Sequence, residues 1–168
     1  MKVLYTAGAR RWRVWFVFGL SVVGAVAGVW AGVNLGQTYG MSPAEGGVLK
    51  PLPVRLAWAI SLSGLGLAFL GGMVVYARRY VTRLQHDAVA GVVHVETLIG
   101  ARVIPVDHLT AARYHAGRLE LEHHVNAPWT SLRVRGRRIP YILDLQGDVH
   151  DARALAGLTR ERAPVHRP

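Results

Sequence analysis

Two long apolar segments dominate the hydrophobic pattern of this chain. Residues 14–36 and residues 56–77 hold 23 and 22 consecutive positions without a charged side chain. About 20 apolar residues in a helix cross the roughly 30 Å hydrocarbon core of a bilayer. Soluble helices rarely stay apolar on every face for so long, because one face usually meets water. The pattern therefore predicts two transmembrane helices.

After the second segment the pattern changes to short runs rich in β-branched residues. Leu132 and Val134 alternate with Arg133 and Arg135, which is typical of a strand with one buried face. Gly136 then permits a tight turn or bulge before the next run. Five such runs between residues 86 and 147, separated by Gly, Pro and Asn, predict antiparallel strands. Residues 151–158 predict a short helix, capped by Asp148 or Asp151.

These elements predict a membrane α-helical hairpin followed by a small cytoplasmic, mainly-β (α+β) domain with a short C-terminal helix. Four cations precede the first span, two (Lys50 and Arg55) lie in the loop between the spans, and three follow the second span closely. The positive-inside rule then predicts that both termini lie on the cytoplasmic side. The expected location is a bacterial inner membrane, either the cytoplasmic membrane or an intracytoplasmic one. The predicted segments are a basic cytoplasmic leader (1–13), transmembrane helix 1 (14–36), an external loop (37–55), transmembrane helix 2 (56–77), the β domain (78–158) and a tail (159–168).

Small residues recur every four positions in both predicted spans. Residues four apart share a helix face, and small side chains there let two backbones approach closely in lipid. The two spans can pack against each other through these stripes, and one stripe can dock onto a helix of another membrane-protein subunit; the two interpretations are compatible, since a hairpin has more than one face. The stripes consist of Gly24, Gly28, Gly32 and Gly36 in the first span and Gly64, Ala68 and Gly72 in the second.

Basic residues give the chain a net charge of +10 and concentrate beside the membrane and in the β domain. Few aromatic residues accompany them, so stacking on nucleic-acid bases is not indicated. Guanidinium groups bind phosphate and carboxylate well, so the predicted partners are anionic lipids or acidic subunits rather than nucleic acid. The predicted partner or lipid contacts are Arg78, Arg79, Arg133, Arg135, Arg137 and Arg138.

Residues that would indicate catalysis or cofactor binding are sparse. The chain has no cysteine, and neither predicted span contains an Asp, Glu, Lys, Arg or His, which argues against a transporter, pump or proton channel acting alone. The histidines lack metal-ligand spacing, and His123 and His124 are adjacent and point to opposite faces of a strand. Glu120 and Glu122 share a face but resemble a solvated pair. We therefore predict no enzyme activity, no metal site and no cofactor.

Residues 131–147, SLRVRGRRIPYILDLQG, resemble the C-terminal segment of the transmembrane protein 223 family. That family has a basic strand reading KVKGRR, an aromatic strand ending in Leu-Asp, and a glycine turn. The preceding VIPVDHLT is similar to its Val-Pro-Leu stretch, although Ile139 and Pro140 stand where the family has aromatic residues. The resemblance implies two spans, a small β domain, and a role in assembling respiratory complexes of the mitochondrial inner membrane. It brings no catalytic residues.

The functional hypothesis is a non-catalytic accessory or assembly subunit. It would stabilise a large energy-converting electron-transfer complex, respiratory or of the photosynthetic reaction-centre type, by helix packing and cytoplasmic docking. An autonomous lipid-binding module at the membrane surface is the alternative, and an enzyme or metal protein is a third hypothesis.

Overall fold

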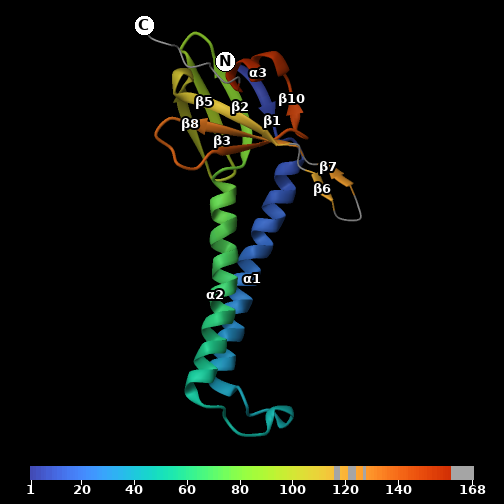
Figure 1. Ribbon diagram of the computed structural model, residues 1–168, viewed down its shortest axis with the longest axis vertical. Coiled ribbons are helices and arrows are strands. Elements are labelled where there is room, and N and C mark those ends of the chain that lie inside the picture. Colours follow the sequence, from blue (N-terminus) through green and yellow to red (C-terminus); the bar gives the residue numbers. More distant parts are fainter. Residues whose placement is uncertain (116–117, 121–123, 127, 160–168) are drawn as a thin grey trace. The chain divides into compact units, whose positions relative to one another are not determined.

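The computed structural model describes residues 1–115, 118–120, 124–126 and 128–159 (Figure 1). The chain forms two compact units. Residues Val14–Val75 form a helical unit, and Met1–Arg13 join the residues from Tyr76 onward in a β domain. The predicted two helices followed by a small, mainly-β domain are confirmed.

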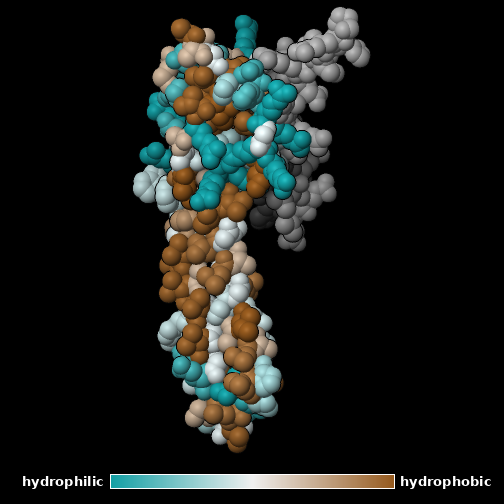
Figure 2. Space-filling model, turned by 90° about the vertical axis from the view of Figure 1, so that its left-hand side faces the viewer, coloured by the Kyte–Doolittle hydropathy of each residue, from teal (hydrophilic) through white to brown (hydrophobic). Residues whose placement is uncertain are grey.

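The helical unit consists of two long apolar helices and a connecting loop. Helix α1 spans Arg10–Thr38 and α2 spans Leu52–Ala77, and both are long and apolar enough to cross a membrane. A 3₁₀ turn, η1 (Pro43–Glu45), lies in the loop. Helix α1 extends beyond the predicted span at both ends, and α2 begins four residues earlier than predicted, because the predicted spans were limited to segments without charge and Arg13 and Arg55 bounded them. Helix α2 ends at Ala77 as predicted. In the view of Figure 2 the surface of the helical unit is mostly hydrophobic, whereas many hydrophilic side chains cover the β domain.

The β domain contains antiparallel pairs in two sheets and a ribbon. The larger sheet has the strand order β10-β1-β2-β3-β4, the smaller has the order β5-β8-β9, and β6 pairs with β7. A 3₁₀ turn, η2 (Val106–His108), lies between β4 and β5. The strands are β1 (Lys2–Thr6), β2 (Val81–Asp87), β3 (Val92–Thr97), β4 (Gly100–Pro105), β5 (Leu109–His115), β6 (Arg118–Glu120), β7 (His124–Asn126), β8 (Trp129–Val134), β9 (Tyr141–Asp144) and β10 (Asp148–Val149).

A parallel bridge between Tyr80 and Ile142 joins the two larger sheets. The Ile142 N–H donates to the Arg79 carbonyl at 2.8 Å, so the chain leaving α2 lies beside β9. The alternation predicted for β8 is confirmed, because Leu132 is buried while Arg133 is exposed. Side chains from both sheets form the core, among them Leu4, Tyr5, Leu84, Val93, Val95, Leu132, Tyr141 and Leu143.

Strand β1 is an element that the sequence analysis did not predict, since residues 1–13 were interpreted as a leader. β1 lies between β2 and β10 in the larger sheet. Its pairing with β2 shifts register between Val3 and Tyr5, and the adjacent Leu4 and Tyr5 are both buried. This irregularity removes the alternating pattern by which a half-buried strand is recognised.

The C-terminal helix α3 (Ala152–Thr159) confirms the predicted short helix. Asp151 is its cap, because the Asp151 Oδ1 accepts from the Ala154 N–H at 2.8 Å. That hydrogen bond, followed by the one from Lys2, lowers the pKa of the Asp151 carboxyl. Thr159, predicted as the first residue of the tail, is the last residue of α3. The remaining tail, 160–168, and His123 lie outside the described residues.

Candidate functional site

The glycines of α1 lie where its backbone approaches α2 most closely. A Cβ added at Gly28 would lie 3.1 Å from the Leu62 carbonyl oxygen. One added at Gly32 would lie 2.7 Å from the Ala59 carbonyl oxygen and would collide with the Ser63 hydroxyl. Glycine is therefore the residue that permits this backbone contact.

Gly36 and Gly24 complete the α1 stripe at its two ends. A Cβ at Gly36 would make an ordinary contact, 3.6 Å from the Ala59 Cβ. At Gly24 an added Cβ would meet no described atom within 4 Å, although the Gly24 carbonyl faces α2. The structure thus brings Gly28, Gly32 and Gly36 of the predicted α1 stripe to the interface between the two helices. Gly24 itself is exposed, and its neighbour Ala25 is the buried residue at that end.

The glycine of α2 that meets α1 is Gly66, which the sequence analysis missed. A Cβ at Gly66 would lie 3.1 Å from the Ala25 Cα and 3.2 Å from the Gly24 carbonyl oxygen. Gly66 and Gly64 are two positions apart and point in nearly opposite directions from a helix. Only one of them can face α1, and that residue is Gly66, whereas the predicted stripe contains Gly64.

The predicted α2 stripe lies on the face of α2 that points away from α1. Gly64, Ala68 and Gly72 are exposed, and a Cβ at Gly64 or Gly72 would meet no described atom within 4 Å. At 100° per residue, Gly64 lies roughly 160° around the helix from Gly66. Ala57 and Ser61 extend this face toward an apolar groove of about 390 Å³. Helix α2 therefore has two faces of small residues, and α1 covers one of them.

The predicted basic contacts differ in how the structure uses them. Arg133, Arg135 and Arg138 are exposed. Arg79 is half-buried, and its Nε donates to the Pro140 carbonyl at 3.0 Å, so it fastens the β8–β9 loop inside the domain.

Arg78, Arg102 and Arg137 line a hollow of about 420 Å³, hereafter called the arginine pocket. The guanidinium carbon of Arg137 lies 3.9 Å from the centre of the Tyr141 ring. The described residues that line the pocket include no acidic side chain; besides the three arginines they are Val95, Thr97, Ile99, Gly100, Ala101 and Tyr141. Arg102 was not predicted, because it is far from both basic runs in the sequence.

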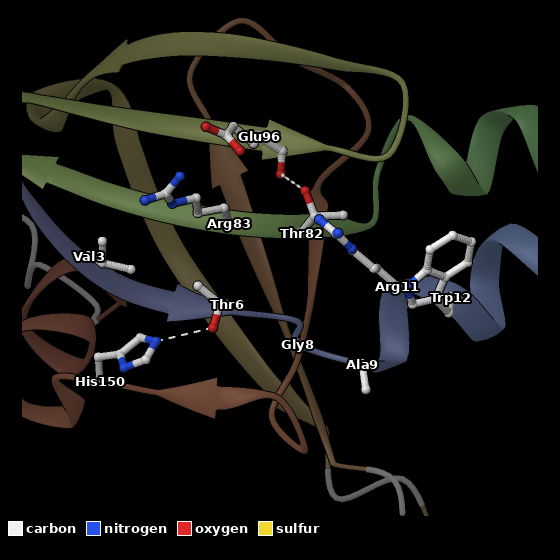
Figure 3. A pocket seen from close by; sticks show the side chains of 10 residues that line it. All are labelled: Val3, Thr6, Gly8, Ala9, Arg11, Trp12, Thr82, Arg83, Glu96 and His150. Carbon is white, nitrogen blue, oxygen red and sulfur yellow. Dashed lines mark hydrogen bonds between the residues drawn. The ribbon is translucent and has the colours of Figure 1, made fainter.

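A larger groove of about 930 Å³ lies beside β1, β2 and the first turn of α1 (Figure 3). Arg83 pairs in register with Thr6 on one side and with Glu96 on the other. The Thr6 hydroxyl lies 3.1 Å from the His150 Nε2. Cations and a carboxylate share this groove, so its charge is mixed, unlike that of the arginine pocket.

A cluster of buried tyrosines lies where β1 leads into α1. Arg10 bridges to Asp144 at 3.4 Å and also donates to the Gln146 side chain. Burial, followed by the nearby Asp144 carboxylate, raises the pKa of the Tyr80 hydroxyl to about 12. Burial also raises the pKa of Tyr5. Among the described residues, no group of three or more His, Asp or Glu side chains is arranged to hold a metal ion.

Comparison with known proteins identifies one family. The model of the TMEM70/TMEM186/TMEM223 protein family matches residues 37–159, which include α2 and nearly all of the described β domain. The match contains residues 131–147, so the resemblance stated for that segment is confirmed. No curated protein and no solved structure matches the chain.

Proposed function

Because the chain belongs to the TMEM70/TMEM186/TMEM223 protein family, we propose that it is an accessory or assembly factor for a respiratory membrane complex. The family is generally linked to respiratory-complex assembly and is of a non-enzymatic type. This link favours a respiratory host over a photosynthetic one. The proposed place of action is a bacterial inner membrane, with both termini on the cytoplasmic side.

The observation that carries this proposal is the second small-residue face of α2. Apolar association does not by itself drive helices together in lipid, so close backbone packing at small residues supplies much of the attraction. The α1 glycines contribute to packing within the hairpin, whereas Gly64 and Ala68 are open. In the proposed mechanism the hairpin forms first, and this open face then receives a helix of the client complex.

The exposed arginines of the β domain provide the second proposed contact. Arg133, Arg135 and Arg138 are exposed, and each can bind a carboxylate with two parallel hydrogen bonds. Helix packing in the membrane and arginine docking outside it would together hold an assembly intermediate.

The test uses the full-length chain in its own host. A tagged chain is solubilised in mild detergent and separated by native electrophoresis, and co-migrating proteins are quantified by mass spectrometry. Wild type is expected to co-migrate with subunits of one respiratory complex, and Gly64→Leu is expected to lose them. Gly19→Leu is the matched control, because Gly19 also has open space around it but lies on α1.

Two results would contradict the proposal. Co-migration of Gly64→Leu at the wild-type level would show that the open α2 face receives no partner helix. Migration of the wild-type chain without any respiratory subunit would rule out the accessory role itself.

A further inference from the structure

We propose that the arginine pocket binds the phosphate group of an anionic phospholipid. Arg78, Arg102 and Arg137 come from three separate parts of the domain and converge on one hollow. Because no described carboxylate lines the pocket, its positive charge is not neutralised within it. Three guanidinium groups with no carboxylate among the described lining residues form a site for a compact anion with several acceptor oxygens. This inference does not depend on the proposed assembly function.

Arg137 is held in place before any ligand arrives. Its guanidinium lies over the ring of Tyr141, which is 1% exposed and therefore fixed in the core. A cation positioned over an aromatic face is attracted to it. An arginine that is already immobilised loses less side-chain freedom on binding a ligand. Arg137 can therefore serve as the rigid wall of the pocket.

Arg102 approaches the pocket from the edge of the larger sheet. It lies on β4 and pairs in register with Val95, so both side chains stand on the same sheet face. Val95 is buried while Arg102 is exposed, which suits a long side chain that runs over apolar surface and ends in a charged group. The turn before β4 is closed by the Thr97 hydroxyl, which donates to the Gly100 carbonyl at 2.9 Å.

Arg78 indicates that the anion is a lipid headgroup. It is the first residue after α2, whose last residue is Ala77. The end of an apolar membrane helix lies at the depth of the phospholipid headgroups, where arginine is favoured. Anionic headgroups are concentrated at that depth, which favours them over a dilute soluble phosphate.

The experiment counts lipids bound to the purified full-length chain by native mass spectrometry in mild detergent. Palmitoyl-oleoyl phosphatidylglycerol is titrated, with the matching phosphatidylcholine as the zwitterionic reference. Wild type is expected to retain one phosphatidylglycerol in preference to phosphatidylcholine. Arg102→Gln should weaken that binding about ten-fold, as expected for a lost hydrogen-bonded ion contact. Arg137→Lys, which keeps the charge but loses the planar fork, should weaken it measurably as well.

Arg133→Gln is the matched control, since it removes the same charge from an exposed strand position outside the pocket. It is expected to change binding by less than about five-fold, the effect of general attraction to an anionic surface. The cation–π contact with the core residue Tyr141 is made by Arg137, so Arg102→Gln leaves that contact in place and tests the site even where an Arg137 variant folds poorly.

Three outcomes would overturn the inference. Equal losses in Arg102→Gln and Arg133→Gln would indicate diffuse attraction rather than a site. Equal retention of phosphatidylcholine would show that anionic charge is not recognised. Full displacement of phosphatidylglycerol by an equal concentration of inorganic phosphate would identify free phosphate as the ligand.

Discussion

Gly32 is the position at which a single added carbon should most disturb the helical hairpin. The Cβ of Gly32→Ala would lie 2.7 Å from the Ala59 carbonyl oxygen, whereas ordinary contacts begin at 3.4 Å. The two backbones must separate by several tenths of an ångström, and the neighbouring contacts along the interface then weaken together. Overpacking of this kind costs about 1–3 kcal/mol. We therefore expect Gly32→Ala to make helix association less favourable by that amount.

The assay uses a disulfide placed where the two helices already have suitable spacing. A Cβ at Gly36 would lie 3.6 Å from the Ala59 Cβ, within the range of disulfides. The chain has no other cysteine, so Gly36→Cys with Ala59→Cys gives one defined cross-link. The fraction cross-linked in a fixed time is followed as sodium dodecyl sulfate is added. In Gly32→Ala the helices should separate more easily, so the cross-linked fraction should fall to half at a lower concentration of sodium dodecyl sulfate.

Gly64→Ala is the matched control for the same assay. Its added Cβ would meet no described atom within 4 Å, so we expect a change of less than about 0.5 kcal/mol. Superimposable curves for Gly32→Ala and Gly64→Ala would refute the argument that the α1 glycines set the distance between the helices.

Three further predictions concern topology and pH. An impermeant thiol reagent should label Val48→Cys but not Val89→Cys in intact cells, because both side chains are exposed and the proposed topology puts the loop between the helices outside and the β domain in the cytoplasm. The reverse pattern would contradict the cytoplasmic β domain. The pKa of Asp151 is lowered, so its stabilising contribution is complete above its ordinary value of 3.8 and is lost as pH falls below it. Asp151→Asn should remove this decrease in melting temperature at acid pH. An unchanged dependence of the melting temperature on pH would contradict the role of the Asp151 carboxylate as the cap of α3. The pKa of Tyr80 is raised from 10.0 to about 12, so its contribution is present below pH 10 and lost between pH 10 and 12. Tyr80→Phe should reduce the loss of thermal stability between pH 10 and 12. A loss as steep as that of wild type would contradict the assignment of this pH dependence to Tyr80.

The sequence was sufficient for those elements whose pattern is regular over many residues. Both helices were predicted because more than 20 uncharged positions in a row leave few alternatives. Strand β8 was predicted because Leu132 and Arg133 begin a strict alternation, and the structure buries one and exposes the other. The cap of α3 was narrowed to Asp148 or Asp151, and only the hydrogen bond to Ala154 distinguished them.

Features that depend on distant parts of the chain were not predictable in the same way. β1 is five residues long and irregular, and its partner β2 begins only after both helices. Arg102 joins Arg78 and Arg137 only through the folding of β3, β4 and the β8–β9 loop. The choice between Gly64 and Gly66 depended on the rotation of α2 about its axis, which helix periodicity leaves undetermined when both faces carry small residues.

The pairing of β1 with β2 imposes a constraint on membrane topology that charge counting alone does not provide. β1 ends at Thr6 and α1 begins at Arg10, while α2 ends at Ala77 and β2 begins at Val81. Because β1 and β2 are hydrogen-bonded neighbours, the first residue of α1 and the last residue of α2 must emerge on the same side of a membrane that the helices cross. A chain of three residues at each junction is too short to reach across a bilayer. If the chain inserted in the reverse orientation, both junctions would therefore lie on the other side of the membrane together. A chain in which only one of the two helices crossed the membrane would have to break the pairing of β1 with β2.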